Sequence, residues 1–302
     1  MSKPLVIRPI YDLLLRGSPS LPLGIFQLHI LTSEQLCRLH YKPGCINAVK
    51  ARLKDLADAA YVQVDAMPIK HVKEGKTYFS PLYYYTLGPK GARYLRQAGL
   101  DVSDAFRASK EVNKHSLFVE HVLELNDVII AAALLRGAGT GFYLHEFIHE
   151  HILRRRPYKA TWRIEGRTET HSLIPDAFLD FRYVTEQKRL RLPVLLEHDR
   201  GTEQQHYFRR RIRAYIALLR AGAQQELFGA RVITIAFTTF VGEQRLAQMR
   251  QWTKQELTSA EAGVKQSFLF ANLPRPLEPC CIWLEPCWQT AFHDQPIALL
   301  ST

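Results

Sequence analysis

Three carboxylates lie where apolar, strand-like segments begin or end, and their spacing could place them around one cation. Asp176 lies in the segment SLIPDAFLDFRYV, and Glu197 and Asp199 close the apolar run PVLLEHD. Side chains two residues apart in a strand point to the same face. The sequence therefore predicts that Glu197 and Asp199 share a face, with His198 on the opposite one.

Carboxylates in this arrangement can bind a divalent metal ion. Mg²⁺ takes carboxylate oxygens together with several waters, and the bound ion can stabilise charge on a phosphate and help generate an attacking hydroxide. Asp176 and Glu197 are the predicted metal ligands. The candidate catalytic acids are these two residues together with Asp199 and Glu146, and Glu150 is the alternative to Glu146 as the acid contributed from upstream.

A structural role is the alternative for these acids. Asp199 opens the run DRGT, which is typical of entry into a helix, and a turn or cap role explains it at least as well as metal binding. Glu197 lies deeper in the strand. Burial of a carboxylate is unfavourable by several kcal/mol unless the group is paired, so we expect a cation or a basic side chain beside Glu197.

The segments around these acids predict an α/β domain with a mixed sheet. Helices are expected at residues 115–139, 201–222 and 243–257, and strands at residues 142–152, 172–184, 191–199, 231–240, 267–273 and 282–286. The strongly apolar strand at residues 191–199 is typical of a central strand that is covered on both faces. Helices packed on such a sheet form an α/β sandwich.

The first hundred residues predict a winged helix-turn-helix. Thr32 and Gln35 have the spacing of a capping box at the start of a helix. The elements expected after this helix are a second helix at residues 46–62, strands at residues 61–67 and 76–87, and a short helix from Thr86 to Gly99. Helix, turn, second helix and two-stranded wing is the order of a winged helix.

The cations of this unit fit a winged helix that binds DNA. The second helix carries Lys50, Arg52 and Lys54 away from its apolar stripe, so they could enter the major groove. A mobile loop between the two strands would reach phosphates with its basic side chains, Lys70, His71, Lys73 and Lys76. The alternatives are a solvated helix face and loop, or a winged helix that docks proteins.

The whole chain is strongly basic. Its 40 Lys and Arg residues outnumber 29 Asp and Glu residues, which gives 302 residues a formal charge of +11 and a pI near 9.5. A polyanion is the expected partner, and nucleic acid is the commonest one, although an acidic membrane surface would select the same charge. The second half adds cations that we expect near phosphate or in a solvated loop: Arg154, Arg155, Arg156, Lys159, Arg163 and Arg167.

Nothing in the sequence predicts a membrane or secreted protein. No apolar run approaches the ~20 residues that span a bilayer, and charged residues interrupt the N-terminal apolar segment, unlike a signal peptide. The five cysteines form no CxxC pair, as is usual for reduced cysteines in a cytoplasmic protein. We predict a winged-helix domain at residues 1–100, a linker at 101–113 and an α/β domain at 114–302.

The acids resemble the site of the PD-(D/E)xK nuclease superfamily, in which one acid ends a strand and an acid-x-lysine lies on its neighbour. Asp176 and Glu197 match the two acids, and Asp199 stands where that motif has lysine. Arg200 is expected on the other face and stays charged, so it is a poor proton acceptor. The resemblance implies a restriction-endonuclease-like mixed-sheet fold and, if the site cuts, a Mg²⁺ or Mn²⁺ ion.

Several segments together resemble the replication-relaxation family of plasmids and other mobile elements. They are residues 31–41, 54–62, 86–95, 115–129, 174–181, 195–203 and 209–219. The most specific is the run EHDRGTE, in which His198 replaces an apolar residue of the family form. The resemblance implies a role in plasmid replication or in DNA relaxation and transfer, through DNA binding, and brings no catalytic mechanism with it.

Three functions are open on these grounds. The first is a non-enzymatic DNA-binding accessory of mobile-element replication, and the second is a Mg²⁺- or Mn²⁺-dependent endonuclease or nickase. The third is a transcriptional regulator whose C-terminal half dimerises or senses a signal. Asp199 in place of lysine favours the first function over the second. Double-stranded DNA is the expected partner, with a second copy of the chain and replication or mobilisation proteins as further ones.

Overall fold

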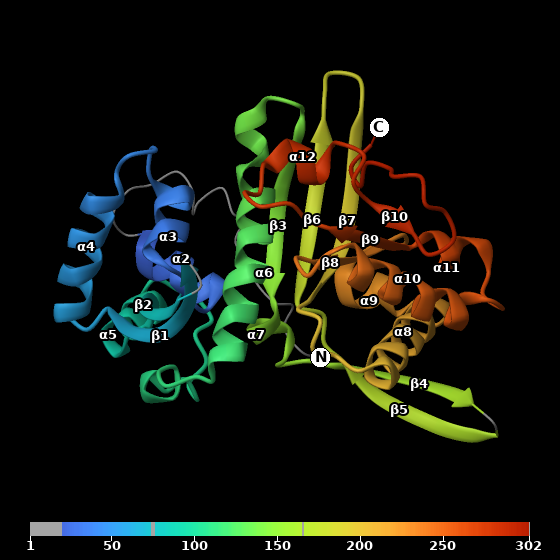
Figure 1. Cartoon of the computed structure of the whole chain (residues 1–302), viewed down its shortest axis with the longest axis horizontal. Helices are drawn as coiled ribbons and strands as arrows, with labels where there is room; N and C mark the ends of the chain where they lie inside the picture. Colours follow the sequence, from blue (N-terminus) through green and yellow to red (C-terminus); the bar gives the residue numbers. More distant parts are fainter. Residues whose placement is uncertain (1–19, 74–75, 165, 302) are drawn as a thin grey trace. The chain divides into compact units, whose positions relative to one another are not determined.

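The computed structural model describes residues 20–73, 76–164 and 166–301, and the chain divides into two compact units between Ile130 and Ala131 (Figure 1). The chain is mixed α/β, as predicted, with helices leading the first unit and a mixed sheet in the second. Each unit has its own apolar core. No helix in the described ranges is both long and apolar enough to cross a membrane.

The first unit consists of short helices and one long β-hairpin. Its elements are α2 (Ser20–Leu28), α3 (Ser33–His40), α4 (Ile46–Asp58), β1 (Val62–Lys73), β2 (Lys76–Leu87), α5 (Pro89–Gln97) and the 3₁₀ helix η1 (Ala108–Lys110). The long helix α6 (Ser116–Leu134) follows and crosses the division between the units. Residues 101–113, the predicted linker, contain η1.

α3 begins with the predicted capping box. The Thr32 hydroxyl accepts a hydrogen bond from the Gln35 backbone N–H at 3.1 Å, and the Gln35 side chain accepts one from the Thr32 N–H at 3.1 Å. These bonds satisfy N–H groups that have no partner within the helix. The Gln35 amide also donates to the Leu123 carbonyl of α6 at 2.8 Å, so one residue fixes both the start of α3 and its place against α6.

β1 and β2 form a longer hairpin than predicted. The antiparallel ladder continues to the pair Lys73↔Lys76, so Lys70 and His71 also lie within a strand. The predicted mobile loop is therefore wrong for residues 68–73, which belong to β1, while residues 74–75 lie outside the described ranges. β-branched and aromatic residues flank the lysines on both strands, and these residue types favour strand pairing strongly enough to extend the ladder past the charges.

α5 begins later than predicted. It starts at Pro89, with Gly88 as its N-cap, whereas Thr86 still belongs to β2. Proline suits the first position of a helix because the N–H it lacks would have no partner there. Gly99 follows the helix with φ +81°, a backbone conformation that favours glycine, and it ends this segment as predicted.

The second unit is built on a six-stranded mixed sheet in the order β10-β9-β8-β7-β6-β3. β7, β8 and β9 are parallel neighbours, while β3–β6, β6–β7 and β9–β10 are antiparallel pairs. The strands are β3 (Phe142–His149), β6 (Ala177–Val184), β7 (Arg189–Asp199), β8 (Thr234–Thr239), β9 (Phe268–Asn272) and β10 (Gln289–Thr290).

Helices cover this sheet on both faces. They are the 3₁₀ helix η2 (Leu135–Ala138), α7 (Glu150–Leu153), α8 (Gln205–Arg220), α9 (Ala223–Phe228), α10 (Glu243–Leu257), α11 (Ala262–Gln266) and α12 (Pro279–Trp283). On one face, Leu195 of β7 shares a core with Phe208 and Tyr215 of α8. On the other, the ring of Phe181 in β6 lies 4.9 Å from that of Trp283 in α12.

A second hairpin, β4 (Tyr158–Ile164) paired with β5 (Arg167–Leu173), is absent from the predicted elements. Its alternate residues Ala160 and Trp162 pack into the core beside α8, but the arginines just before β4 make the segment look like a loop. The predicted strand at residues 282–286 is wrong. Ile282 lies in α12, a short helix that Pro279 starts, and the chain then turns away.

Candidate functional site

Three acids end adjacent strands of the sheet in the second unit. The pairing of β6 with β7 ends at Ala177↔Leu196, so Asp176 and Glu197 come next in register. The Glu150 N–H donates to the Asp176 carbonyl at 2.8 Å, which extends the pairing of β3 with β6 by one residue. Glu150, Asp176 and Glu197 thus lie at the same end of three neighbouring strands.

Asp176 is buried and lies close to Glu150. Its Oδ2 accepts a hydrogen bond from the His198 N–H at 2.7 Å. Carboxylate oxygens of Asp176 and Glu150 lie within 4.8 Å of each other. Glu150 also forms an ion pair at 2.5 Å with Arg154, one helical turn later. Of the two upstream acids considered from the sequence, Glu150 is therefore the one that accompanies Asp176.

Glu146 belongs to a separate charged group on the same sheet. It pairs across the strands with Asp180, in the middle of β6. Asp180 forms ion pairs with Arg182 at 2.8 Å and with Arg191 at 2.9 Å. Burial, with a further contribution from the Asp180 charge, raises the pKa of Glu146. The structure does not bring Glu146 together with Asp176.

Glu197 is buried and has the basic partner that its position predicts. Its Oε2 accepts a hydrogen bond from the Arg211 guanidinium at 2.7 Å, and its Oε1 accepts one from the Tyr215 hydroxyl at 2.5 Å. Arg211 also donates to Glu203 at 2.9 Å. Burial raises the pKa of Glu197 to about 8; the Asp176 charge adds to the rise, while Arg211 and Tyr215 oppose it.

Asp199 makes the turn contacts that its DRGT run predicts. Its two oxygens accept hydrogen bonds from Arg245 of α10 at 2.7 and 2.8 Å, and Oδ1 also accepts one from the Gly201 N–H at 2.7 Å. Gly201 has φ +75°, so the chain turns there in a conformation that favours glycine. The buried, bidentate pair with Arg245 fixes the end of β7 to α10.

Arginines occupy much of the space that a metal ion would need. Arg211 contacts Glu197, and Arg245 takes both oxygens of Asp199. A divalent ion binds through several carboxylate oxygens, and these two acids already direct theirs at guanidinium groups. Of the predicted ligand pair Asp176 and Glu197, only Asp176 fits a metal site in this arrangement.

Arg211, Tyr215 and Arg245 complete the network and are absent from the predicted site residues. The depth of Glu197 indicates a basic partner, and α8 carries four arginines close in sequence, so the sequence does not say which one reaches inward. Helical spacing offers a signal, because Arg211 and Tyr215 are four residues apart and share a face. For Arg245 the sequence offers no such signal, since this residue lies 46 positions from Asp199.

In the first unit, the predicted DNA-contacting cations of α4 are exposed. Lys50, Arg52 and Lys54 face water, while the opposite side of the helix buries Val49 and Leu53. Lys50 lies 3.6 Å from the exposed carboxylate of Glu34. Exposed ion pairs of this kind contribute little free energy, so a phosphate can replace Glu34 as the partner of Lys50.

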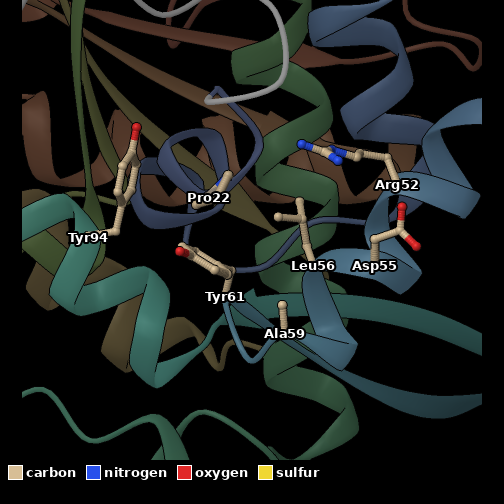
Figure 2. Close-up of a pocket in the computed structure, with 7 residues that line it drawn as sticks. All are labelled: Pro22, Arg52, Asp55, Leu56, Ala59, Tyr61 and Tyr94. Carbon is tan, nitrogen blue, oxygen red and sulfur yellow. The ribbon is translucent and has the colours of Figure 1, made fainter.

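Arg52 also borders a pocket of about 460 Å³ beside α4, shown in Figure 2. The other residues that line it are Pro22, Asp55, Leu56, Ala59, Tyr61 and Tyr94. The rings of Tyr61 and Tyr94 meet edge to face with their centroids 6.2 Å apart. Arg52 and Asp55 are thus the charged residues of a lining that is otherwise apolar or aromatic.

The hairpins carry most of the other predicted cations. On the β1–β2 hairpin Lys70 and Lys76 are exposed, and Lys73 lies at the end of β1. On the β4–β5 hairpin Lys159 and Arg163 are exposed on the outer face, because the alternate residues turn inward to α8. The remaining predicted cations are also exposed: Arg154, Arg155 and Arg156 precede β4, and Arg167 begins β5.

A family model described as replication-relaxation matches residues 25–231, which is more than half of the chain. The chain belongs to the replication-relaxation family. The matched region of this family member includes the EHDRGTE run and α8, which supplies Arg211, and it ends before β8. No curated protein and no solved structure matches the chain.

Proposed function

We propose that this replication-relaxation family member is a non-enzymatic DNA-binding protein that acts in the replication or relaxation of plasmid or other mobile-element DNA. Its expected partners are double-stranded DNA, replication or mobilisation proteins, and a second copy of the chain. The proposal is carried by one observation: each unit presents exposed cations on projecting elements, α4 and the β1–β2 hairpin in the first and the β4–β5 hairpin in the second.

The first unit is proposed to be a winged helix. α3 and α4 precede the two-stranded β1–β2 hairpin, and Leu31 forms an isolated bridge to it by exchanging two backbone hydrogen bonds with Tyr85, at 3.1 and 2.8 Å. In this fold the second helix of the helix-turn-helix enters the major groove and the wing lies along the backbone. α4, with Lys50, Arg52 and Lys54, takes the place of that helix.

Charge supplies the affinity in this proposal. A protein that neutralises phosphates with Lys and Arg releases condensed counterions, and this release dominates binding that does not depend on base sequence. The formal charge of +11 supports such binding. Lys159 and Arg163, which share the outer face of their hairpin with threonine and serine hydroxyls, would contact a second stretch of phosphates.

The acids support the non-enzymatic part of the proposal. Arg211 already supplies the positive charge that a metal would bring to Glu197, and Arg245 does the same for Asp199. Buried carboxylates paired in this way hold elements together, here β7 to α8 and α10. No lysine stands at position 199 to complete the nuclease motif.

A Mg²⁺- or Mn²⁺-dependent endonuclease or nickase is the second candidate, and one observation favours it. Asp176 and Glu150 end adjacent strands with carboxylate oxygens within 4.8 Å, a spacing that fits a shared divalent ion. In that function the ion would stabilise charge on the scissile phosphate. The chain's own part would be to hold Asp176 in place through the His198 N–H.

Cleavage of supercoiled plasmid distinguishes the two candidates. The wild type, Asp176→Asn and Glu150→Gln are incubated with plasmid and Mg²⁺ or Mn²⁺, and nicked and linear products are measured by gel electrophoresis. We expect no product from any of the three, with duplex binding retained. Metal-dependent nicking by the wild type that both substitutions abolish would establish the nuclease and contradict the non-enzymatic proposal.

Duplex binding tests the role of α4. The double variant Lys50→Ala, Arg52→Ala is expected to weaken binding to duplex DNA and to reduce the slope of log K against log salt by about two, because two phosphate contacts are lost. The matched control removes two exposed cations from the β6–β7 turn, Lys188→Ala with Arg189→Ala. Equal losses in both double variants would remove α4 from the DNA-contacting surface.

A further inference from the structure

One face of the β1–β2 hairpin exposes large apolar side chains to water. Phe79 is 66% exposed, Val72 67% and Tyr83 56%. The register pairs Phe79 with Lys70, Val72 with Thr77 and Tyr83 with Ala66, so all of these side chains share one face. We refer to Lys70, Val72, Phe79 and Tyr83 as the aromatic strip.

The aromatic strip lies beyond the base of the hairpin, where Val62 and Leu87 of the same face are buried. Met67 and Tyr84, on the opposite face, are buried in a core with Ile30 and with Val119 and Val122 of α6. Exposed apolar patches of this kind usually mark a site of interaction. Beyond its base, the hairpin therefore packs through one face and leaves the other open to a ligand.

Prolines block the edges of the hairpin but leave the aromatic strip open. Tyr85 directs its N–H and C=O away from β1 toward Leu31, so Pro81, four residues earlier, has its nitrogen on the same outer edge. Pro68 is the partner of Pro81 and faces the opposite edge. Each proline removes an N–H that another strand could use. The hairpin thus resists strand addition at these points, and its aromatic strip stays open to a ligand.

The charge of the face indicates what it binds. Lys70 is exposed and lies directly opposite Phe79, so it supplies a positive charge on this face. Asp65 belongs to the opposite face, where it accepts a hydrogen bond from Tyr84. Among the described residues, the register places no acid on the aromatic strip's face. An anionic ligand with flat apolar groups complements such a surface, and unpaired nucleic acid has both.

We propose that the aromatic strip binds single-stranded DNA by stacking unpaired bases on Phe79 and Tyr83, with Lys70 on the backbone. The two rings are four residues apart along one strand, roughly 13 Å, so they would receive bases that are not adjacent. This proposal rests on the proposed DNA-binding function and extends it, because it assigns α4 to duplex DNA and the hairpin face to a melted or nicked region.

Fluorescence anisotropy with three labelled ligands tests the proposal: an oligothymidylate of about 20 nucleotides, the same length of abasic strand, and a duplex. Phe79→Ala and Tyr83→Ala are each expected to weaken binding to the oligothymidylate about tenfold. Phe79→Trp is expected to retain it, since a larger ring still stacks. Binding to the abasic strand and to the duplex is expected to change little, because neither offers unstacked bases.

Tyr78→Ala is the matched control, because Tyr78 is an exposed aromatic on the opposite face of the same hairpin, where it stacks on His71. Equal weakening by Tyr78→Ala and Phe79→Ala, or equal loss on the abasic strand, would overturn base stacking. Base stacking would also be overturned if Phe79→Ala dissociated a dimer without changing strand binding, since the aromatic strip would then join two chains. A wild type that binds duplex but not oligothymidylate overturns this inference alone, whereas one that binds neither overturns the proposed function as well.

Discussion

At the scale of single residues, Arg211 compensates the negative charge of two acids in the second unit. It bonds to Glu197 at 2.7 Å and to Glu203 at 2.9 Å, and burial raises the pKa of both carboxyls. Breaking a buried ion pair from one side costs more free energy than replacing both members, because the remaining charge stays buried without compensation. The network should therefore tolerate paired substitution better than single substitution.

Above the Glu197 pKa of about 8, where the carboxylate is ionised, Arg211→Met is expected to lower the free energy of unfolding by about 3–5 kcal/mol, since Glu197 loses its opposing charge. Adding Glu197→Gln should recover part of that loss. Urea denaturation of the wild type, the two single variants and the double variant measures the coupling. Arg210→Met, next along α8 and exposed, is the control and should change the free energy of unfolding by less than about 0.5 kcal/mol. A double variant less stable than Arg211→Met would contradict this account of the pair.

The pH dependence of stability should carry a contribution from Glu197. Its pKa is about 8 in the folded chain against 4.5 for an ordinary glutamate, so the native state holds the proton more tightly than the unfolded state. The resulting stabilisation is complete below about pH 4.5 and is lost as the pH rises through about 8. Glu197→Gln should flatten the fall of the unfolding free energy across this range, measured by urea denaturation at several pH values. An unchanged slope would mean that Glu197 does not titrate there.

At the scale of elements, caps and turns decide where each helix begins. The capping box of α3 is an example, because both of its hydrogen bonds are 3.1 Å long and both donors would otherwise lack helical partners. Thr32→Ala should lower the free energy of unfolding by about 1 kcal/mol. Thr32→Ser keeps the hydroxyl and should retain most of the stability. Thermal unfolding followed by circular dichroism compares the two, and equal losses would show that the methyl group, rather than the cap, is responsible.

The same elements show how far sequence reasoning reaches. The capping box, the strand containing Glu197 and the helix containing Arg211 were predictable because hydrophobic period and local hydrogen bonding act within a few residues. The β4–β5 hairpin was not, since its apolar side needs α8 to cover it and its exposed cations resemble a loop. The Asp199–Arg245 pair could not be predicted from the sequence either, because only the folded sheet brings β7 and α10 together.

At the scale of the whole molecule, positive charge is shared between two units that are each folded around their own core. Lys159→Ala with Arg163→Ala should weaken duplex binding and lower its salt slope by about two. Combined with Lys50→Ala and Arg52→Ala, the changes in binding free energy should add, since the cations lie on separate elements. Thr161→Ala with Thr168→Ala removes hydroxyls from the same outer face and should have a much smaller effect. A combined variant no weaker than either double variant would contradict two separate contacts.

The place of β8 has a practical consequence for anyone who cuts this protein into fragments. The family match ends at residue 231, yet β8 lies between β7 and β9 and pairs with β7 from Val194 to Asp199. A fragment ending at 231 would turn β7 into an open edge of the kind that templates aggregation. It would also lack Arg245 and leave Asp199 buried without its partner. The part matched by the family model is therefore shorter than the sheet that contains β7, and recombinant fragments should extend through β9.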